Sequence, residues 1–276
     1  MQIIHTVAEL RERLSRETSI SLVPTMGNLH AGHLHLVELA KQHGECVVVS
    51  IFVNPLQFGA NEDLASYPRT LAEDCAKLEA AGAAILFAPS ETEMYPVAQT
   101  MMVTSPPIAN ELCGASRPGH FGGVATVVLK LFNIVQPQAA AFGKKDFQQL
   151  FIIRELVRQL NLPIKIVAGE TVREADSLAM SSRNGYLSAE SRAQAPRFYQ
   201  ALLHAVEQLQ SGKDIATAEA EAGTLLMDSG WAVEYISVRS ADSLLPPKQE
   251  ENALVVLGAA RLGSTRLIDN IEFLRS

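Results

Sequence analysis

Residues 24–33 of this chain, Pro-Thr-Met-Gly-Asn-Leu-His-Ala-Gly-His, join an apolar run to a helical pattern. The apolar run Ile20–Val23 precedes them, and Leu36, Leu39 and Ala40 follow them at helix spacing. The stretch therefore predicts a strand, a glycine-bearing turn and a helix. Because the first amide groups of a helix have no partner inside the helix, its N-terminus is a ready site for an anion.

His30 and His33 lie three positions apart at the start of this helix, so they share one face. Two imidazoles there can donate hydrogen bonds to phosphate oxygens without adding a fixed negative charge. A metal-binding pair or two surface histidines are the alternatives, but no cysteine or Glu-x-x-His pattern nearby supplies further ligands. His-x-Gly-His after a strand resembles the HIGH signature of a nucleotidyltransferase superfamily that includes class I aminoacyl-tRNA synthetases.

Composition excludes several classes of protein. The 276 residues allow one large domain or two ordinary ones, and 47% hydrophobic residues supply ample material for a core. A net charge of −7 argues against a nucleic-acid partner, which requires a basic face. The three widely spaced cysteines, Cys46, Cys75 and Cys113, fit a reducing, cytoplasmic location. No signal peptide and no run of ~18 apolar residues is visible, so we expect no membrane partner.

Apolar runs alternate with helical patterns through the first two-thirds of the chain. The expected strands are 20–24, 46–53, 84–88, 101–104, 139–142 and 164–168, and the expected helices are 7–15, 34–43, 70–81, 124–135 and 146–160. Apolar strands separated by amphipathic helices predict an α/β fold with a doubly wound, Rossmann-like parallel sheet. Ligands of such sheets bind beyond the carboxyl ends of the strands, where residues 26–33 fall.

The pattern changes after about Glu170, so we expect a first domain at 1–171 and a smaller α+β domain at 172–276. In the second domain we expect helices at 189–210 and 215–228 and strands at 232–238, 254–260 and 265–270. Gly263-Ser264 between the last two strands predicts a hairpin.

Further polar clusters lie at the ends of apolar runs. Gln57, between Leu56 and Phe58, suits a neutral, hydroxyl-rich ligand, whereas Asn54 before Pro55 is also explained by turn chemistry. The glycine-rich stretch 117–126 permits close approach of a ligand to the backbone, although a loop at a helix start is equally compatible.

Two cationic clusters indicate an anionic partner. Lys144 and Lys145 precede a helix, where the helix dipole disfavours cations, and Gln149 lies four residues after Lys145. Residues 180–184, Met-Ser-Ser-Arg-Asn, offer hydroxyls and a guanidinium to a triphosphate, although capping serines in a polar loop would look the same. Glu73-Asp74 could hold Mg²⁺ or could be an ordinary acidic first turn.

Six motifs occur in order along almost the whole chain: Pro-Thr-Met-Gly…His-x-Gly-His, Phe-Val-Asn-Pro-x-Gln-Phe, Tyr-Pro-Arg-Thr, Arg-Pro-Gly-His-Phe, Lys-Asp-Phe-Gln-Gln and Met-Ser-Ser-Arg-Asn. Together they resemble the pantoate–β-alanine ligase family. The resemblance implies that ATP and Mg²⁺ are used to join (R)-pantoate to β-alanine, giving pantothenate, AMP and pyrophosphate through a pantoyl adenylate. It also implies a homodimer formed through the first domain.

The resemblance assigns roles residue by residue. The catalytic residues are His33 as proton donor, His30, Lys145 and Arg183. Pantoate is assigned to Gln57 and Gln149, β-alanine to Gln57, and the metal to Glu73 and Asp74. The residues assigned to ATP are Met26, Gly27, Asn28, Leu29, His30, Ala31, Gly32, His33, Gly143, Lys144, Lys145, Asp146, Val172, Met180, Ser181, Ser182 and Arg183.

The chain departs from the family pattern at Asn28, Lys144 and Gly122, and no departure removes a catalytic group. An adenylyltransferase acting on a phosphate ester is the alternative enzyme, but the two glutamines suit a neutral diol better than a second phosphate. An RNA-binding module is the alternative from another class, and the negative net charge and 6% aromatic content argue against it.

Overall fold

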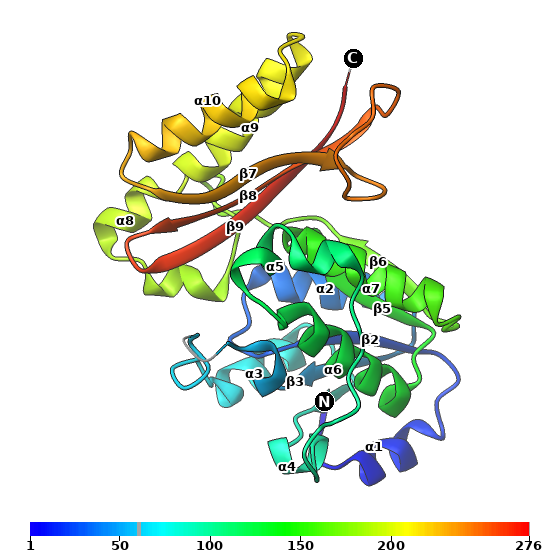
Figure 1. Cartoon of the computed structure of the whole chain (residues 1–276). Helices are drawn as coiled ribbons and strands as arrows, with labels where there is room; N and C mark the ends of the chain where they lie inside the picture. The colour runs from blue at the N-terminus through cyan, green and yellow to red at the C-terminus, as the bar shows by residue number, and fades with distance from the viewer. Residues whose placement is uncertain (60–61, 276) are drawn as a thin grey trace. The chain divides into compact units, whose positions relative to one another are not determined.

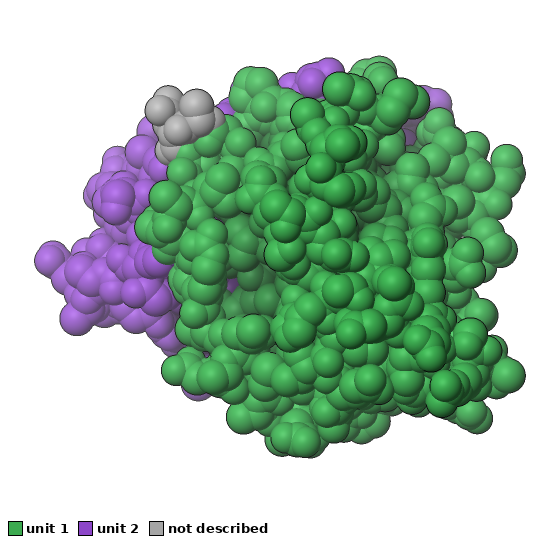
Figure 2. Space-filling view, turned by 90° about the horizontal axis from the view of Figure 1, so that it is seen from below, with its two compact units in different colours: residues 1–109, 117–144, 149–170 green, residues 110–116, 145–148, 171–276 purple. Residues whose placement is uncertain are grey.

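The computed structural model describes residues 1–59 and 62–275, which divide into two compact units (Figure 2). The first unit comprises residues 1–109, 117–144 and 149–170. The second comprises residues 110–116, 145–148 and everything from 171 onward. Two short segments that we expected in the first domain therefore group with the second unit. The division into a first domain at 1–171 and a smaller domain at 172–276 stays a prediction.

Six parallel strands form the sheet of the first unit in the described residues (Figure 1). They are β1 (Gln2–Ile4), β2 (Ile20–Thr25), β3 (Cys46–Ile51), β4 (Ile85–Phe87), β5 (Ala139–Gly143) and β6 (Lys165–Gly169), in the order β1-β4-β3-β2-β5-β6. This order confirms the predicted α/β fold. The order reverses between β2 and β5, and the carboxyl ends at such a switch point are where ligands of open α/β sheets bind.

Helices cover both faces of this sheet. They are α1 (Val7–Leu14), α2 (Ala31–Lys41), α3 (Leu71–Ala80), α6 (His120–Val135) and α7 (Phe147–Gln159), with the short α4 (Glu91–Met94) near β4. Neighbouring residues of β2 point to opposite faces, since side chains alternate along a strand. Leu22 packs in one core with residues of α1, α6 and α7, whereas Val23 packs in the other with residues of α2 and α3.

The structure corrects one expectation for the first unit and adds one strand that was not predicted. The predicted strand at 101–104 is irregular: Met101 is 81% exposed, and the Val103 amide donates to Thr126 Oγ1 (3.0 Å) instead of to a strand. The edge strand β1 was not predicted because only Ile4 of its three residues is buried, which is too short a pattern to recognise.

The second unit contains an antiparallel sheet of β7 (Ala232–Ser240), β8 (Ala253–Leu262) and β9 (Thr265–Leu274). Leu262 pairs with Thr265, which confirms the predicted hairpin. Helices α9 (Arg197–Gln210) and α10 (Ile215–Met227) pack on this sheet.

One long helix was predicted at 189–210, but the chain forms α8 (Ala189–Gln194) and then α9. The break lies at Pro196, which cannot donate a helical hydrogen bond and restricts the residue before it. Within the described chain, no helix is long and apolar enough to cross a membrane.

Candidate functional site

The turn between β2 and α2 has a backbone that only certain residues can adopt. Gly27 and Asn28 have positive φ angles of 82° and 50°. A Cβ on Gly27 would lie 3.1 Å from Ile51 Cγ2 and 3.2 Å from Asp74 Oδ2. Glycine is therefore required there, while asparagine tolerates the left-handed conformation better than most side chains. The departure at Asn28 thus fits the local backbone.

The side chain of Asp74, on α3, holds the main chain of this turn. Its two carboxylate oxygens accept hydrogen bonds from the amides of Asn28 and Leu29, both at 2.8 Å. Thr70 Oγ1 adds a third bond at 3.2 Å, and Asp74 is fully buried. A buried carboxylate is tolerated because these donors replace the water that it has lost.

His30 and His33 form a reciprocal cap at the start of α2. His30 Nδ1 accepts from the Gly32 amide (3.2 Å), and His33 Nδ1 accepts from the His30 amide (3.3 Å). The two ring centroids lie 4.1 Å apart, which confirms that the histidines share a face. Because each Nδ1 is an acceptor, the proton of each neutral ring lies on Nε2. The arrangement places two imidazole rings together at a helix N-terminus.

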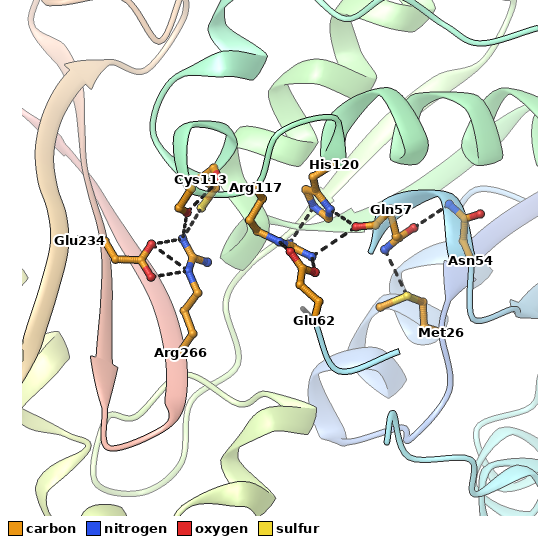
Figure 3. A network of polar contacts seen from close by, with 10 residues as sticks. Met26, Asn54, Gln57, Glu62, Cys113, Arg117, His120, Glu234 and Arg266 are labelled. Carbon is orange, nitrogen blue, oxygen red and sulfur yellow. Dashed lines mark hydrogen bonds and ion pairs between the residues drawn. The ribbon is translucent and has the colours of Figure 1, made fainter. Parts of the chain in front are cut away.

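Gln57 ends the short 3₁₀ helix η1 (Pro55–Gln57) and is 9% exposed. Its Nε2 donates to Met26 Sδ (3.2 Å), and its Oε1 accepts from Asn54 Nδ2 (3.0 Å), as Figure 3 shows. Asn54 in turn accepts from the Tyr95 hydroxyl (2.8 Å), and burial raises the pKa of Tyr95, which keeps that hydroxyl protonated. The structure thus brings Gln57 to the β2–α2 turn through Met26.

Arg117 and His120 fix the backbone of Gln57 (Figure 3). His120 Nδ1 lies 2.7 Å from the Gln57 carbonyl oxygen, which can only accept, so Nδ1 carries the proton. His120 Nε2 then accepts from Arg117 Nη1 (2.9 Å), and Arg117 pairs with Glu62, with Nε at 2.8 Å from Oε1. A Cβ on Gly123 would lie 2.1 Å from the Leu56 carbonyl oxygen, so only glycine lets α6 approach this segment.

Two neighbouring lysines after β5 have different partners. Lys144 Nζ pairs with Glu170 Oε1 at 2.6 Å. Lys145 Nζ lies 3.9 Å from Asp146 Oδ2, and the side chain is 19% exposed. Gly143, the last residue of β5, places both lysines after the strand that borders the switch point.

The adjacent glutamines on α7 also differ. Gln148 is buried, with Oε1 accepting from the Cys113 amide (3.1 Å) and Nε2 donating to the Glu111 carbonyl (2.9 Å). Gln149 is half-buried, and its side chain has no hydrogen-bond partner among the described residues. The structure therefore leaves Gln149, and not Gln148, as the candidate ligand of the pair.

Residues 110–116 are fastened to the sheet of the second unit. The Tyr235 hydroxyl lies 3.0 Å from Cys113 Sγ, and Arg266 Nη2 lies 3.4 Å from Ser116 Oγ. Arg266 is held in place by Glu234, as Figure 3 shows. These contacts explain why this short segment groups with the second unit.

The second unit also contains the hairpin that carries Val172 and Met180. The Met180 amide donates to the Val172 carbonyl (3.0 Å), and Arg173 pairs with Ala179. Ser181 caps the following 3₁₀ helix η4 (Ser182–Tyr186), accepting from the Arg183 amide (3.2 Å). Val172 and Met180, which are both assigned to the nucleotide, are thus paired across this hairpin.

The predicted metal ligands do not form a cage. Glu73 is exposed on α3, while both oxygens of Asp74 are taken by main-chain amides. No group of three His, Cys, Asp or Glu side chains in the described residues could hold a metal ion. The geometry gives Asp74 the role of anchoring the turn, which the sequence did not suggest because its partners lie 45 and 46 residues away.

Comparison with known proteins identifies the family. The profile described as Pantoate-beta-alanine ligase matches residues 2–272. Pantothenate synthetase from Methylobacillus flagellatus is 66% identical over 99% of both chains, and that from Thiobacillus denitrificans is 60% identical over 99% of this chain and 97% of its own.

Solved structures of the same family superpose on this chain over almost its whole length. Pantothenate synthetase from Thermus thermophilus superposes with a TM-score of 0.94, at 46% identity and 99% coverage of both chains. Pantoate-beta-alanine ligase from Francisella tularensis, crystallised with beta-gamma ATP and β-alanine, superposes with a TM-score of 0.82 at 33% identity, over 99% of this chain and 97% of its own.

Proposed function

This chain belongs to the pantoate-beta-alanine ligase family, and from that membership we propose how its own residues serve the reaction. The protein is a ligase that synthesises pantothenate from pantoate and β-alanine at the expense of ATP. The observation that carries our assignment of roles is the β2–α2 turn, where the imidazole rings of two histidines lie together at a helix N-terminus.

The first step that we propose is the formation of pantoyl adenylate. A pantoate carboxylate oxygen attacks the α-phosphorus of ATP, the bond to the β-phosphate oxygen breaks, and pyrophosphate leaves. Two anions meet in this step, so the developing charge must be neutralised by positioned donors. His30, His33, Lys145 and Arg183 are the groups that we assign to this task.

The second step that we propose consumes the adenylate. The β-alanine amine attacks the acyl carbon, the bond to AMP breaks, and the amide of pantothenate forms. Gln57 and Gln149 are assigned to pantoate, because amides can donate to and accept from its hydroxyl groups. Gln57 also borders the amine site, and its position is supported by the Asn54 and Met26 contacts and by the Arg117–His120 relay to its carbonyl.

Three further assignments belong to the proposal. Mg²⁺ accompanies ATP, as the resemblance implies, and no step is assigned to it because Asp74 is committed to the turn. A homodimer follows from the same resemblance and is checked by sedimentation equilibrium. The cytoplasmic location is supported by three cysteines that are all free thiols.

Isotope exchange tests the two-step scheme. With ATP, Mg²⁺ and pantoate alone, we expect label to pass from pyrophosphate into ATP, while AMP release requires β-alanine as well. Omitting pantoate should abolish both. Exchange that depends on β-alanine would replace the adenylate with a concerted reaction, and exchange without pantoate would mean that another carboxylate or phosphate ester is adenylated.

A further inference from the structure

Asn270 in β9 fixes the main chain of Lys145. Its Nδ2 donates to the Lys145 carbonyl oxygen at 2.9 Å, and the residue is 6% exposed. The Lys145 carbonyl belongs to the 3₁₀ helix η3 (Lys144–Asp146), which carries the lysine assigned to phosphate. Asn270 therefore determines where the base of that side chain lies.

Asp269, the preceding residue, fixes the hairpin that leads to Met180. Its carboxylate makes a two-pronged pair with Arg173, with Nη1–Oδ2 at 2.6 Å and Nη2–Oδ1 at 2.9 Å. The Arg173 guanidinium also donates to the Ser177 carbonyl (3.1 Å) and lies 4.0 Å from the centroid of the Tyr199 ring. Because Arg173 pairs with Ala179 across the hairpin, this contact locates the start of the segment 180–183.

Asn270 breaks the burial pattern of its strand. Buried and half-buried residues alternate from Thr265 to Asp269, but Asn270 is buried as well, and both Asp269 and Asn270 are polar. Burying polar groups costs free energy unless they are fully hydrogen-bonded, so apolar packing does not explain the choice. Asp269 Oδ1 also accepts from the Asn270 amide (2.8 Å), which couples the pair directly.

We propose that Asp269 and Asn270 are positioning residues that set the spacing between Lys145 and the segment 180–183, and so shape the site for the triphosphate of ATP. This inference rests on the ATP roles proposed above for those two segments. Lys145 and residues 171 onward belong to the same unit, so one pair of adjacent residues in β9 places both. Side chains that are neighbours in a strand point to opposite faces, which lets one pair hold two segments.

The dependence of AMP formation on ATP concentration tests the proposal, whether or not an adenylate is formed. For Asn270→Ala, the loss of one hydrogen bond predicts that the KM for ATP rises about 2–10-fold, while the KM values for pantoate and β-alanine stay unchanged. Asp269→Asn should give a rise at least as large, because it removes the charge from a two-pronged pair. Arg173→Lys carries the same test if Asp269→Asn does not fold, since lysine cannot replace the two-pronged contact.

Ser240→Ala is the matched control. Ser240 is also a buried polar residue of this sheet, but it donates to Glu251 Oε1 (3.2 Å) in a neighbouring loop. We expect its KM for ATP to equal that of the wild type. A loss of function that came merely from damage to the sheet would appear in this variant too.

Double variants show whether Asn270 acts through Lys145 and whether Asp269 acts through the segment 180–183. In a Lys145→Ala background, Asn270→Ala should raise the KM for ATP no further, and in an Arg183→Ala background the same should hold for Asp269→Asn. Independent multiplying effects, or equal changes in the KM of all three substrates, would overturn the proposal. If Lys145→Ala and Arg183→Ala themselves leave ATP use unchanged, the assigned ATP roles fail and this inference fails with them. If those two lower ATP use while Asn270→Ala and Asp269→Asn do not, the inference alone fails.

Discussion

Two buried aspartates, one in each unit, hold two of the segments assigned to ATP, and they do so in different ways. Asp74 accepts the main-chain amides of Asn28 and Leu29 in the β2–α2 turn. Asp269 accepts the side chain of Arg173 at the base of the 172–180 hairpin. The contacts to Asp74 use no side chain of the turn, although its positive φ angles restrict residues 27 and 28, whereas the hairpin depends on one particular arginine.

This difference accounts for where the chain tolerates change. Asn28 departs from the family pattern, yet its amide still donates to Asp74 and its φ of 50° suits asparagine. Arg173 has no such freedom, because a lysine would lose one prong of the contact to Asp269. The comparison therefore predicts distinct outcomes for variants in the two units.

The largest effect is expected in the turn held by amides. His33→Ala removes an Nε2–H donor and the acceptor of the His30 amide, and we expect the rate of AMP formation to fall by ~10²–10³ with the fold retained. His35→Ala, exposed on the same helix, serves as the control and should keep the wild-type rate. A near-normal rate in folded His33→Ala would remove the turn from the chemistry.

The next largest effect is expected for Asp74, whose carboxylate holds the β2–α2 turn. Asp74→Asn keeps one acceptor oxygen but sets an amide N–H against the other main-chain donor, so the free energy of unfolding should fall by about 1–3 kcal/mol. Glu73→Ala, at an exposed neighbouring position, should change it by less than about 0.5 kcal/mol. Urea unfolding measures the free energy of unfolding of both variants. Equal decreases would show that the Asp74 carboxylate does not stabilise the turn.

Two adjacent glutamines allow the two units to be compared one residue at a time, because Gln149 belongs to the first unit and Gln148 to the second. Gln149→Ala should raise the KM for pantoate by about 2–10-fold, corresponding to the loss of one hydrogen bond of about 0.5–1.5 kcal/mol, with stability unchanged. Gln148→Ala should lower stability, because the Cys113 amide loses its acceptor. The reverse pattern in steady-state kinetics and unfolding would exchange their roles.

The smallest effect concerns the carboxyl group of Glu219, which accepts fewer hydrogen bonds than that of Asp74. Burial raises the pKa of Glu219 above its ordinary value of 4.5, and the hydrogen bond from the Val238 amide and the charge of Arg239 lower it by less. A raised folded-state pKa contributes stability at low pH that is lost as pH rises through that pKa. The stability of Glu219→Gln relative to wild type should therefore increase from about pH 4 to neutral pH. A difference independent of pH in urea midpoints would contradict this.

Sequence patterns predicted the elements whose signals are local and strong. Apolar runs identified β2, β3, β5 and β6, and His30 and His33 were paired from their spacing alone. The failures have physical causes: residues 101–104 are apolar but meet no neighbouring strand, and β1 is too short to show a pattern. The ion pair of Lys144 with Glu170 had no local signal in the sequence, and the assignment of Lys144 to ATP stays a prediction.

By itself, the sequence determined the α/β class, the strand–turn–helix of residues 24–33 and the family with its reaction, because hydrophobic period, glycine placement and ordered motifs are local properties of the chain. Only the tertiary structure decided which polar residues support the site. Asp74 reaches across 45 residues to Leu29, Arg117 across 60 to the Gln57 carbonyl, and Asn270 across 125 to Lys145. Such partners follow from the order of strands and the packing of helices, and one sequence carries no local signal of which distant carboxylate or amide will face a given turn.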